Sequence, residues 1–313
     1  MWTWSGSTAR FELGLNQVAL EQALVQNIEG VPKPNHVTSW LSGLGCAKRA
    51  ELACSVLLAL REMGTAEINV AHYNTAISAC SKGPQWQLAL GMLSEMTGAK
   101  IEKNSISFNA AVSACGKSQQ WQPALALLAE MTAAKVDKDV ITYSCAITAC
   151  EKGLQWPLAL GLLDEMSFDH VSKDVITYNS AITACEKGLQ WELALGLLSE
   201  MAAAQIAKNT ISFSAAVSAC GRSQQWQPAL AILAEMKIAK VDKDLITYGS
   251  AISAFERGLQ WQLALGLLSE MAVAKIKMDV ISCNPAVSAC DKGAQWQLAT
   301  QILAGMPRAF TQM

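Results

Sequence analysis

The sequence carries little charge, and this shortage narrows the range of functions. Of its 313 residues only 16% are charged, and the formal net charge is −2, so the chain as a whole does not attract nucleic acid. No apolar run approaches the ~18 residues of a membrane span. Hydrophobic residues make up 51%, which excludes a disordered chain. We therefore expect a soluble, folded protein with no membrane contact.

Signatures of catalysis and metal binding are also missing. The three histidines, His36, His72 and His170, lack metal-ligand spacing, and no two cysteines form a CxxC pair. There is no phosphate-binding glycine loop, no HExxH motif and no GxSxG motif. We therefore predict no enzyme activity, no metal and no cofactor.

What the sequence does contain is a repeat of 35 residues. Tryptophans recur with this period, and a methionine follows each of them at a constant distance. The tryptophans are Trp86, Trp121, Trp156, Trp191, Trp226, Trp261 and Trp296. The period predicts repeats 70–104, 105–139, 140–174, 175–209, 210–244, 245–279 and 280–313, preceded by a diverged repeat 37–69 and an N-terminal segment 1–36. In the diverged repeat, a gapless alignment of Val37 with Val175 places Trp40 in the position of Tyr178.

Each repeat is predicted to form two helices. In 175–209, Thr177 suits an N-cap, apolar residues then follow a 3–4 spacing, Gly188 marks a turn, and a second apolar face begins at Trp191. Stacked hairpins of this kind give an all-α fold, a right-handed superhelical α-solenoid of helix-turn-helix hairpins whose first helices line the concave side.

The cysteines fit this interpretation as core residues. Six of the ten occupy one position of the repeat, and Phe255 fills that position in a seventh repeat, so the site accepts either side chain. The six are Cys80, Cys115, Cys150, Cys185, Cys220 and Cys290. Buried, reduced thiols are typical of an intracellular protein.

The motif VITYNSAITACEKGLQWELALGLLSEM, residues 175–201, resembles the repeat of the pentatricopeptide-repeat family, and the resemblance extends over residues 37–306. The tetratricopeptide repeat has 34 residues and carries its tryptophan in the first helix, whereas the tryptophan here opens the second. One departure is a lysine where the family usually has a proline, at Lys103, Lys138, Lys173, Lys208 and Lys243. Since proline would stiffen the loop, we expect more flexible turns.

The resemblance implies that single-stranded RNA is bound with one base per repeat. A branched apolar residue just before each first helix would sandwich the base: Ile106, Ile141, Ile176, Ile211, Ile246 and Ile281. A residue in the first turn and the last residue of the repeat would read it. These base-reading pairs are Asn74 with Asn104, Asn109 with Asp139, Ser144 with Asp174, Asn179 with Asn209, Ser214 with Asp244, and Gly249 with Asp279.

Asn offers donors and an acceptor, Ser a hydroxyl and Asp acceptors only, so such pairs can distinguish bases. By resemblance to the family's code, repeats 70–104 to 210–244 would prefer 5′-Y-U-G-Y-G-3′. Gly249 has no side chain to read with. In the first repeat Leu41, paired with Asn69, cannot hydrogen-bond, so we expect that repeat to be a cap or a weak contact. The alternative is a purely structural role, in which these Asn, Ser and Asp residues only cap helices.

A cation recurs at the end of each first helix, and the family uses this residue on phosphate. The phosphate-contacting candidates are Lys82, Lys117, Lys152, Lys187, Arg222, Arg257 and Lys292. The alternative role is stabilisation of the helix C-terminus. Neighbouring acids, Glu151, Glu186, Glu256 and Asp291, are expected to weaken RNA binding. The tryptophans could stack on bases, but their helical spacing favours packing that seals the hairpin.

The resemblance implies a role in organellar RNA metabolism, in RNA stabilisation, processing or translation, in a mitochondrion or chloroplast. We expect a monomer that lacks catalysis of its own and relies on a protein partner for any chemistry. The competing interpretation is a protein-binding scaffold, which the near-neutral charge would suit. Residues 1–36 leave a transit peptide and a capping half-repeat open.

Overall fold

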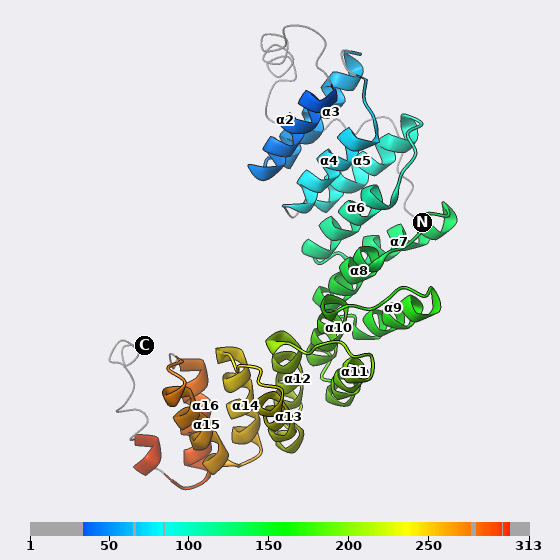
Figure 1. Ribbon diagram of the computed structural model, residues 1–313. Coiled ribbons are helices and arrows are strands. Elements are labelled where there is room, and N and C mark those ends of the chain that lie inside the picture. The colour runs from blue at the N-terminus through cyan, green and yellow to red at the C-terminus, as the bar shows by residue number, and fades with distance from the viewer. Residues whose placement is uncertain (1–33, 65–66, 84, 277–279, 296, 301–313) are drawn as a thin grey trace. The chain divides into compact units, whose positions relative to one another are not determined.

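The computed structural model describes residues 34–64, 67–83, 85–276, 280–295 and 297–300, and every regular element in these ranges is an α-helix (Figure 1). The chain divides between Lys138 and Asp139 into two parts. The first part contains α2 (Pro34–Cys46), α3 (Ala50–Glu62), α4 (Val70–Ser81), α5 (Trp86–Gly98), α6 (Ser105–Lys117) and α7 (Trp121–Ala133). The second contains α8 (Val140–Lys152), α9 (Trp156–Phe168), α10 (Val175–Lys187), α11 (Trp191–Ala203), α12 (Thr210–Arg222), α13 (Trp226–Ile238), α14 (Leu245–Arg257), α15 (Trp261–Val273) and α16 (Val280–Lys292).

Within each part the helices form two layers. Even-numbered helices, the first helices of the repeats, pack against one another in chain order, as α4 does on α6 and α12 on α14. Each odd-numbered helix packs against the even-numbered helix of its own repeat and, where the same part contains the following repeat, against the first helix of that repeat. This is the all-α stack of helix-turn-helix hairpins that the 35-residue period predicts.

The last residue of one repeat starts the first helix of the next. Asp174 has extended backbone angles, φ −113° and ψ 175°, and its Oδ1 accepts from the backbone N–H of Thr177 at 2.8 Å and from the Thr177 hydroxyl at 2.6 Å. The N-cap is therefore Asp174, and the prediction of Thr177 was wrong by three residues. Asn69, Asn104, Asp139, Asn209 and Asp244 cap their helices in the same way. Each such cap contributes about 1 kcal/mol.

The hairpin turns close with a reversal of backbone handedness. After α10, Leu189 takes φ 58°, and the N–H of Gln190 donates to the carbonyl of Cys185 at 2.9 Å. This pattern satisfies carbonyls that the helix end would leave unpaired. The same closure follows α11 at Gln205, where the N–H of Ile206 reaches the carbonyl of Met201 at 2.9 Å.

The core lies between the two layers. Tyr178 and Ile182 on α10 and Ala194 and Met201 on α11 are fully buried, and these two helices pack against each other. The six periodic cysteines are buried, and so is Phe255 in the same position, as their interchange predicts. Burial raises the pKa of Cys115 to about 12 and that of Cys185 to about 11. These thiols act as small apolar side chains.

The first hairpin starts three residues earlier than the sequence alignment indicates. The same interval separates Pro34 from Ala50 as separates Val175 from Trp191, the starts of the paired helices elsewhere. Val37 therefore takes the position of Tyr178 and is fully buried, whereas Trp40 is 37% exposed. The placement of Trp40 in the tyrosine position was wrong. Three residues make nearly one helical turn, so both registers place apolar residues on the same face.

Lysines at the expected proline position are held in place. Lys243 lies 5.6 Å from the ring centre of Tyr248, and its Nζ is 2.6 Å from Glu270 Oε1, which also accepts from the Tyr248 hydroxyl at 3.1 Å. We call this arrangement the lysine clamp. It recurs with Lys103, Phe108 and Glu130, with Lys173, Tyr178 and Glu200, and with Lys208, Phe213 and Glu235.

The clamp replaces the local rigidity of proline with contacts between repeats, because it joins a loop to the two helices that follow. The four lysine side chains are only 11–16% exposed. The expectation of flexible turns took no account of these contacts. Among the helices described, none combines the length and apolar character needed to cross a bilayer.

Candidate nucleic-acid interface

The structure brings together side chains that the sequence predicts as base-reading pairs. Asn179 lies in the first turn of α10, and its Nδ2 donates to Oδ1 of Asn209 at 3.2 Å, although 30 residues separate the two. The Ser212 hydroxyl donates to Oδ1 of Asn179 at 2.6 Å and completes the cluster. Asn74, Asn104 and Ser107 form the same cluster, at 3.2 and 2.5 Å.

Within this cluster one polar group remains available. Oδ1 of Asn209 accepts from the backbone N–H of Ser212 at 3.0 Å and from Nδ2 of Asn179 at 3.2 Å. Because these donors fix the oxygen side of the amide, its Nδ2 is directed away from them, and it has no partner among the described residues. The Asn/Asn pair therefore presents an N–H donor.

The Ser/Asp pairs are arranged differently. The hydroxyl of Ser144 donates to the carbonyl of Ile141, and that of Ser214 to Ile211, each at 3.1 Å, so neither serine contacts its paired aspartate. Oδ1 of Asp174 caps α10, as Oδ1 of Asp244 caps α14 at 2.8 Å from the Thr247 N–H. The second carboxylate oxygen of each aspartate has no partner in the described ranges. A Ser/Asp pair thus presents an acceptor and a short side chain.

The remaining predicted reading residues differ in what the structure shows. Asn109 lies in the first turn of α6, and Asp139 caps α8. Gly249 is buried in α14 and offers backbone only. Asp279 lies outside the described residues. Leu41 is fully buried, and Thr38 occupies the position equivalent to Asn179 instead. Sequence reasoning missed Thr38, although Pro34, a residue suited to the start of a helix, signalled the correct register.

The predicted base-sandwiching residues are exposed isoleucines. Each is the second residue of its helix, inside the first turn rather than before it. Their exposed fractions are 61% for Ile106, 58% for Ile141, 63% for Ile176, 58% for Ile211 and 63% for Ile246. Burying such a side chain would gain about 1.5–3 kcal/mol, so each of these five isoleucines is a candidate apolar contact for a ligand. The side chain of Ile281 lies outside the described residues.

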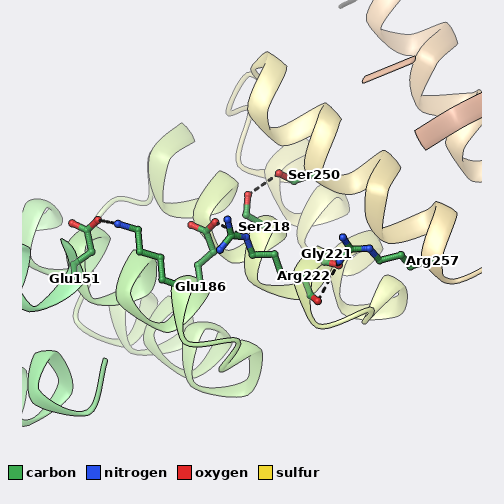
Figure 2. Close-up of polar contacts among 8 residues, drawn as sticks. Glu151, Glu186, Ser218, Gly221, Arg222, Ser250 and Arg257 are labelled. Atoms are coloured by element: carbon green, nitrogen blue, oxygen red, sulfur yellow. Dashed lines mark hydrogen bonds and ion pairs between the residues drawn. The ribbon is translucent and has the colours of Figure 1, made fainter. Parts of the chain in front are cut away.

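The predicted phosphate-contacting cations do not have equal surroundings. Lys187 Nζ lies 2.7 Å from Glu151 Oε1, Lys292 Nζ 2.7 Å from Glu256 Oε1, and Arg222 Nε 3.5 Å from Glu186 Oε1. Figure 2 shows the acids Glu151 and Glu186 with their partners on the next repeat.

The other four cations have no carboxylate partner among the described residues. Arg257 Nη1 donates to the carbonyls of Gly221 and Arg222 at 2.9 and 3.2 Å, and Lys82 Nζ lies 3.4 Å from Cys46 Sγ. No described contact engages Lys117 or Lys152. The expected weakening by neighbouring acids therefore has a geometric basis at three positions and not at the others.

Three of the periodic tryptophans pack between repeats. A Cβ on Gly188 would lie 2.6 Å from Cγ of Trp156, which belongs to the preceding repeat, and inside the rest of the indole ring. Gly258 faces Trp226 and Gly293 faces Trp261 in the same way, at 2.7 and 2.9 Å to Cγ. The rings thus seal the junction with the following hairpin, which extends the packing role predicted for them within one hairpin.

A sequence model described as the pentatricopeptide repeat domain matches residues 56–118, 126–188 and 161–223, more than half of the chain. The chain belongs to the pentatricopeptide repeat (PPR) family. A model of the single PPR repeat also matches residues 106–136 and 246–276. No curated protein sequence matches this PPR chain.

Solved PPR structures have the same fold. Pentatricopeptide repeat protein PPR10 from maize is 19% identical, with TM-score 0.63 over 94% of this chain and 46% of that one. PPR10 in complex with an 18-nt psaJ RNA element is 18% identical, with TM-score 0.68 over 92% of this chain and 48% of that one. The PPR domain of Arabidopsis thaliana protein-only RNase P 1, in complex with tRNA, is 16% identical, with TM-score 0.51 over 60% of this chain and 95% of that one. This PPR chain thus spans just under half the length of the PPR10 chains.

Proposed function

We propose that this PPR chain binds single-stranded RNA sequence-selectively, one base per repeat, through the first turns of its even-numbered helices and without catalysis of its own. The contact between Asn179 and Asn209, repeated by Asn74 and Asn104, carries the proposal, because it places both predicted reading residues of one repeat at one point. Similar folds were solved in complex with an 18-nt RNA element and with tRNA, which supports the same ligand class here.

The exposed isoleucines supply the apolar contact that a base needs. An unstacked base loses the neighbours that shielded its faces in RNA, and an apolar side chain on each side replaces them. Ile176 and Ile211 stand at equivalent positions of successive repeats, so a base held near Asn179 would lie between them.

In the Asn/Asn and Ser/Asp pairs, the polar group without a described partner accounts for the expected letters. Nδ2 of Asn209 is a donor, which suits the acceptor atoms on the pairing edge of cytosine. The free carboxylate oxygen of Asp174 is an acceptor, which suits the ring N–H of guanine or uracil. The short side chain of Ser144 leaves room for the larger guanine, whereas Asn109 with Asp139 suits uracil. The preferred sequence is then 5′-Y-U-G-Y-G-3′, and the first repeat adds Thr38 with Asn69.

We further propose that the chain acts by occupancy in organellar RNA metabolism, as a monomer that protects RNA, keeps it unfolded or brings it to a protein partner that supplies catalysis. This part of the proposal rests on the family and on the binding site, which offers hydrogen bonds and apolar surface to a base.

Binding to a short RNA containing CUGCG tests the proposal, compared with a scrambled RNA and with the equivalent DNA. Asn109→Ser converts one repeat from the Asn/Asp to the Ser/Asp pair, so it should shift preference from CUGCG to CGGCG by about tenfold, the effect of ~1.4 kcal/mol. Unchanged preference would refute the code. No binding at low salt would refute RNA binding and favour the protein-binding scaffold.

A further inference from the structure

The seven periodic cations fall into two classes. We propose that RNA phosphate is held by Lys82, Lys117, Lys152 and Arg257, the open cations, and not by the paired cations Lys187, Arg222 and Lys292. An acid one repeat earlier already neutralises each paired cation. This inference rests on the proposed RNA binding and specifies which repeats hold the backbone.

The evidence is a ladder of contacts between repeats. The penultimate residue of α8 is Glu151, and it contacts the last residue of α10, Lys187. The same relation joins Glu186 of α10 to Arg222 of α12, and Glu256 of α14 to Lys292 of α16. The three glutamate side chains are only 13–18% exposed. These carboxylates are therefore partly desolvated, and each depends on its cation for compensation.

The ladder is interrupted where the penultimate residue is not acidic. At Gly221 the reason is close packing, because a Cβ there would lie 2.8 Å from the carbonyl oxygen of Ser250 on α14. No acidic side chain fits, and Arg257 donates to main-chain carbonyls instead, as Figure 2 shows. Among the described residues, no carboxylate lies within ion-pair distance of Arg257. The equivalent residue before Lys117 is Ser81, which carries no charge, and in the sequence the position 36 residues before Lys152 is likewise uncharged.

Open and paired cations differ in the net free energy that binding a phosphate would contribute. An open cation exchanges salt ions for phosphate, which contributes about −0.7 to the logarithmic salt slope of single-strand binding. A paired cation must first leave its carboxylate, and an unpaired, partly buried charge is unfavourable. Glu256 illustrates this dependence: burial alone would raise its pKa, but hydrogen bonds from Lys292 and Ser288 outweigh that effect and lower it. Four open cations predict a slope of about −3, against about −5 for all seven.

Two triple variants with the same change in charge test this inference. Lys117→Gln with Lys152→Gln and Arg257→Gln removes three open cations, and Lys187→Gln with Arg222→Gln and Lys292→Gln removes the paired ones. Glutamine keeps an N–H donor for each glutamate, and circular dichroism would verify that both variants fold. Binding of the CUGCG RNA is measured from 50 to 200 mM salt.

Over this range the affinity of the unaltered chain should fall about 50-fold and that of the open-cation variant about threefold, with the paired-cation variant like the unaltered chain. Equal slopes for the two variants would overturn the inference. Neutralising Glu151, Glu186 and Glu256 to Gln should release the paired cations and steepen the slope by about 2, a gain that misfolding cannot produce. An unchanged slope would overturn the inference. Absence of RNA binding by the unaltered chain would overturn the proposed function as well.

Discussion

Gly188→Ala probes the junction between successive repeats. Gly188 has φ −82°, an ordinary value for alanine, so its backbone conformation does not require glycine. The requirement comes from Trp156, whose Cγ and Nε1 would lie 2.6 and 2.9 Å from an added Cβ. These atoms belong to the body of the indole ring rather than to a flexible end, so the ring or the turn must move.

The expected magnitude follows from two opposing terms. Overpacking of this kind costs about 1–3 kcal/mol, and alanine in place of glycine recovers about 0.4–1 kcal/mol by restricting the unfolded chain. The net expectation is a loss of about 1–2 kcal/mol. Two repeats carry serine at this position, Ser118 and Ser223, so the junction tolerates a side chain. This tolerance favours the lower half of that range.

Gly83 provides the matched control, because it stands at the equivalent turn and a Cβ there meets nothing within 4 Å. Gly83→Ala should therefore be neutral or stabilising by up to about 1 kcal/mol. Urea unfolding followed by circular dichroism measures both, and the cost of Gly188→Ala should vanish in a Trp156→Leu background. If Gly188→Ala behaves like Gly83→Ala, or if its cost persists without the indole, the reasoning is refuted.

Two further predictions concern the lysine clamp and the first hairpin. Burial would raise the pKa of Glu270, but the hydrogen bond and charge of Lys243 outweigh burial and lower the pKa below the usual 4.5. The clamp's contribution to stability is therefore present above about pH 4.5 and is lost as pH falls below that value. In acid unfolding curves, Lys243→Met should reduce this dependence of stability on pH, and curves parallel to those of the unaltered chain would contradict the prediction. Leu41→Ala should lower the free energy of unfolding by about 2–5 kcal/mol as a core truncation. Thr38→Val should reduce the free energy of RNA binding more than the free energy of unfolding measured in urea. If Leu41→Ala instead mainly affects RNA binding and Thr38→Val mainly affects unfolding, the register in which Leu41 faces RNA would be restored.

The periodic pattern was sufficient to predict the hairpins, because a strict 35-residue period with two apolar faces admits few other arrangements. Details that depend on one residue were less secure. Thr177 and Asp174 are both good caps, and only the backbone angles distinguish them. In the first repeat, a shift of one turn preserves the apolar face, so the pattern could not separate Leu41 from Thr38.

At the candidate site, too, some features could be predicted from the sequence and others could not. The pairing of Asn179 with Asn209 was predictable from the family's repeat, since both positions recur in every copy. The acids beside the cation stripe were visible in the sequence, but not which cation each one contacts, because Glu151 lies next to Lys152 in the chain and pairs with Lys187. The lysine clamp could not be foreseen, since it joins residues of a loop and two helices that only packing brings together.

In the described repeats, the last residue of each proposed recognition pair is also the N-cap of the next helix, and these two roles together limit which residue types can stand at that position. Oδ1 of Asn209 caps α12, and under the proposed function its Nδ2 would bind a base. Replacing it with a residue that cannot cap would change the letter and loosen the following hairpin by about 1 kcal/mol at once. A new RNA sequence preference should therefore be obtained with less loss of stability by varying positions such as Asn179, where serine and glycine stand in other repeats.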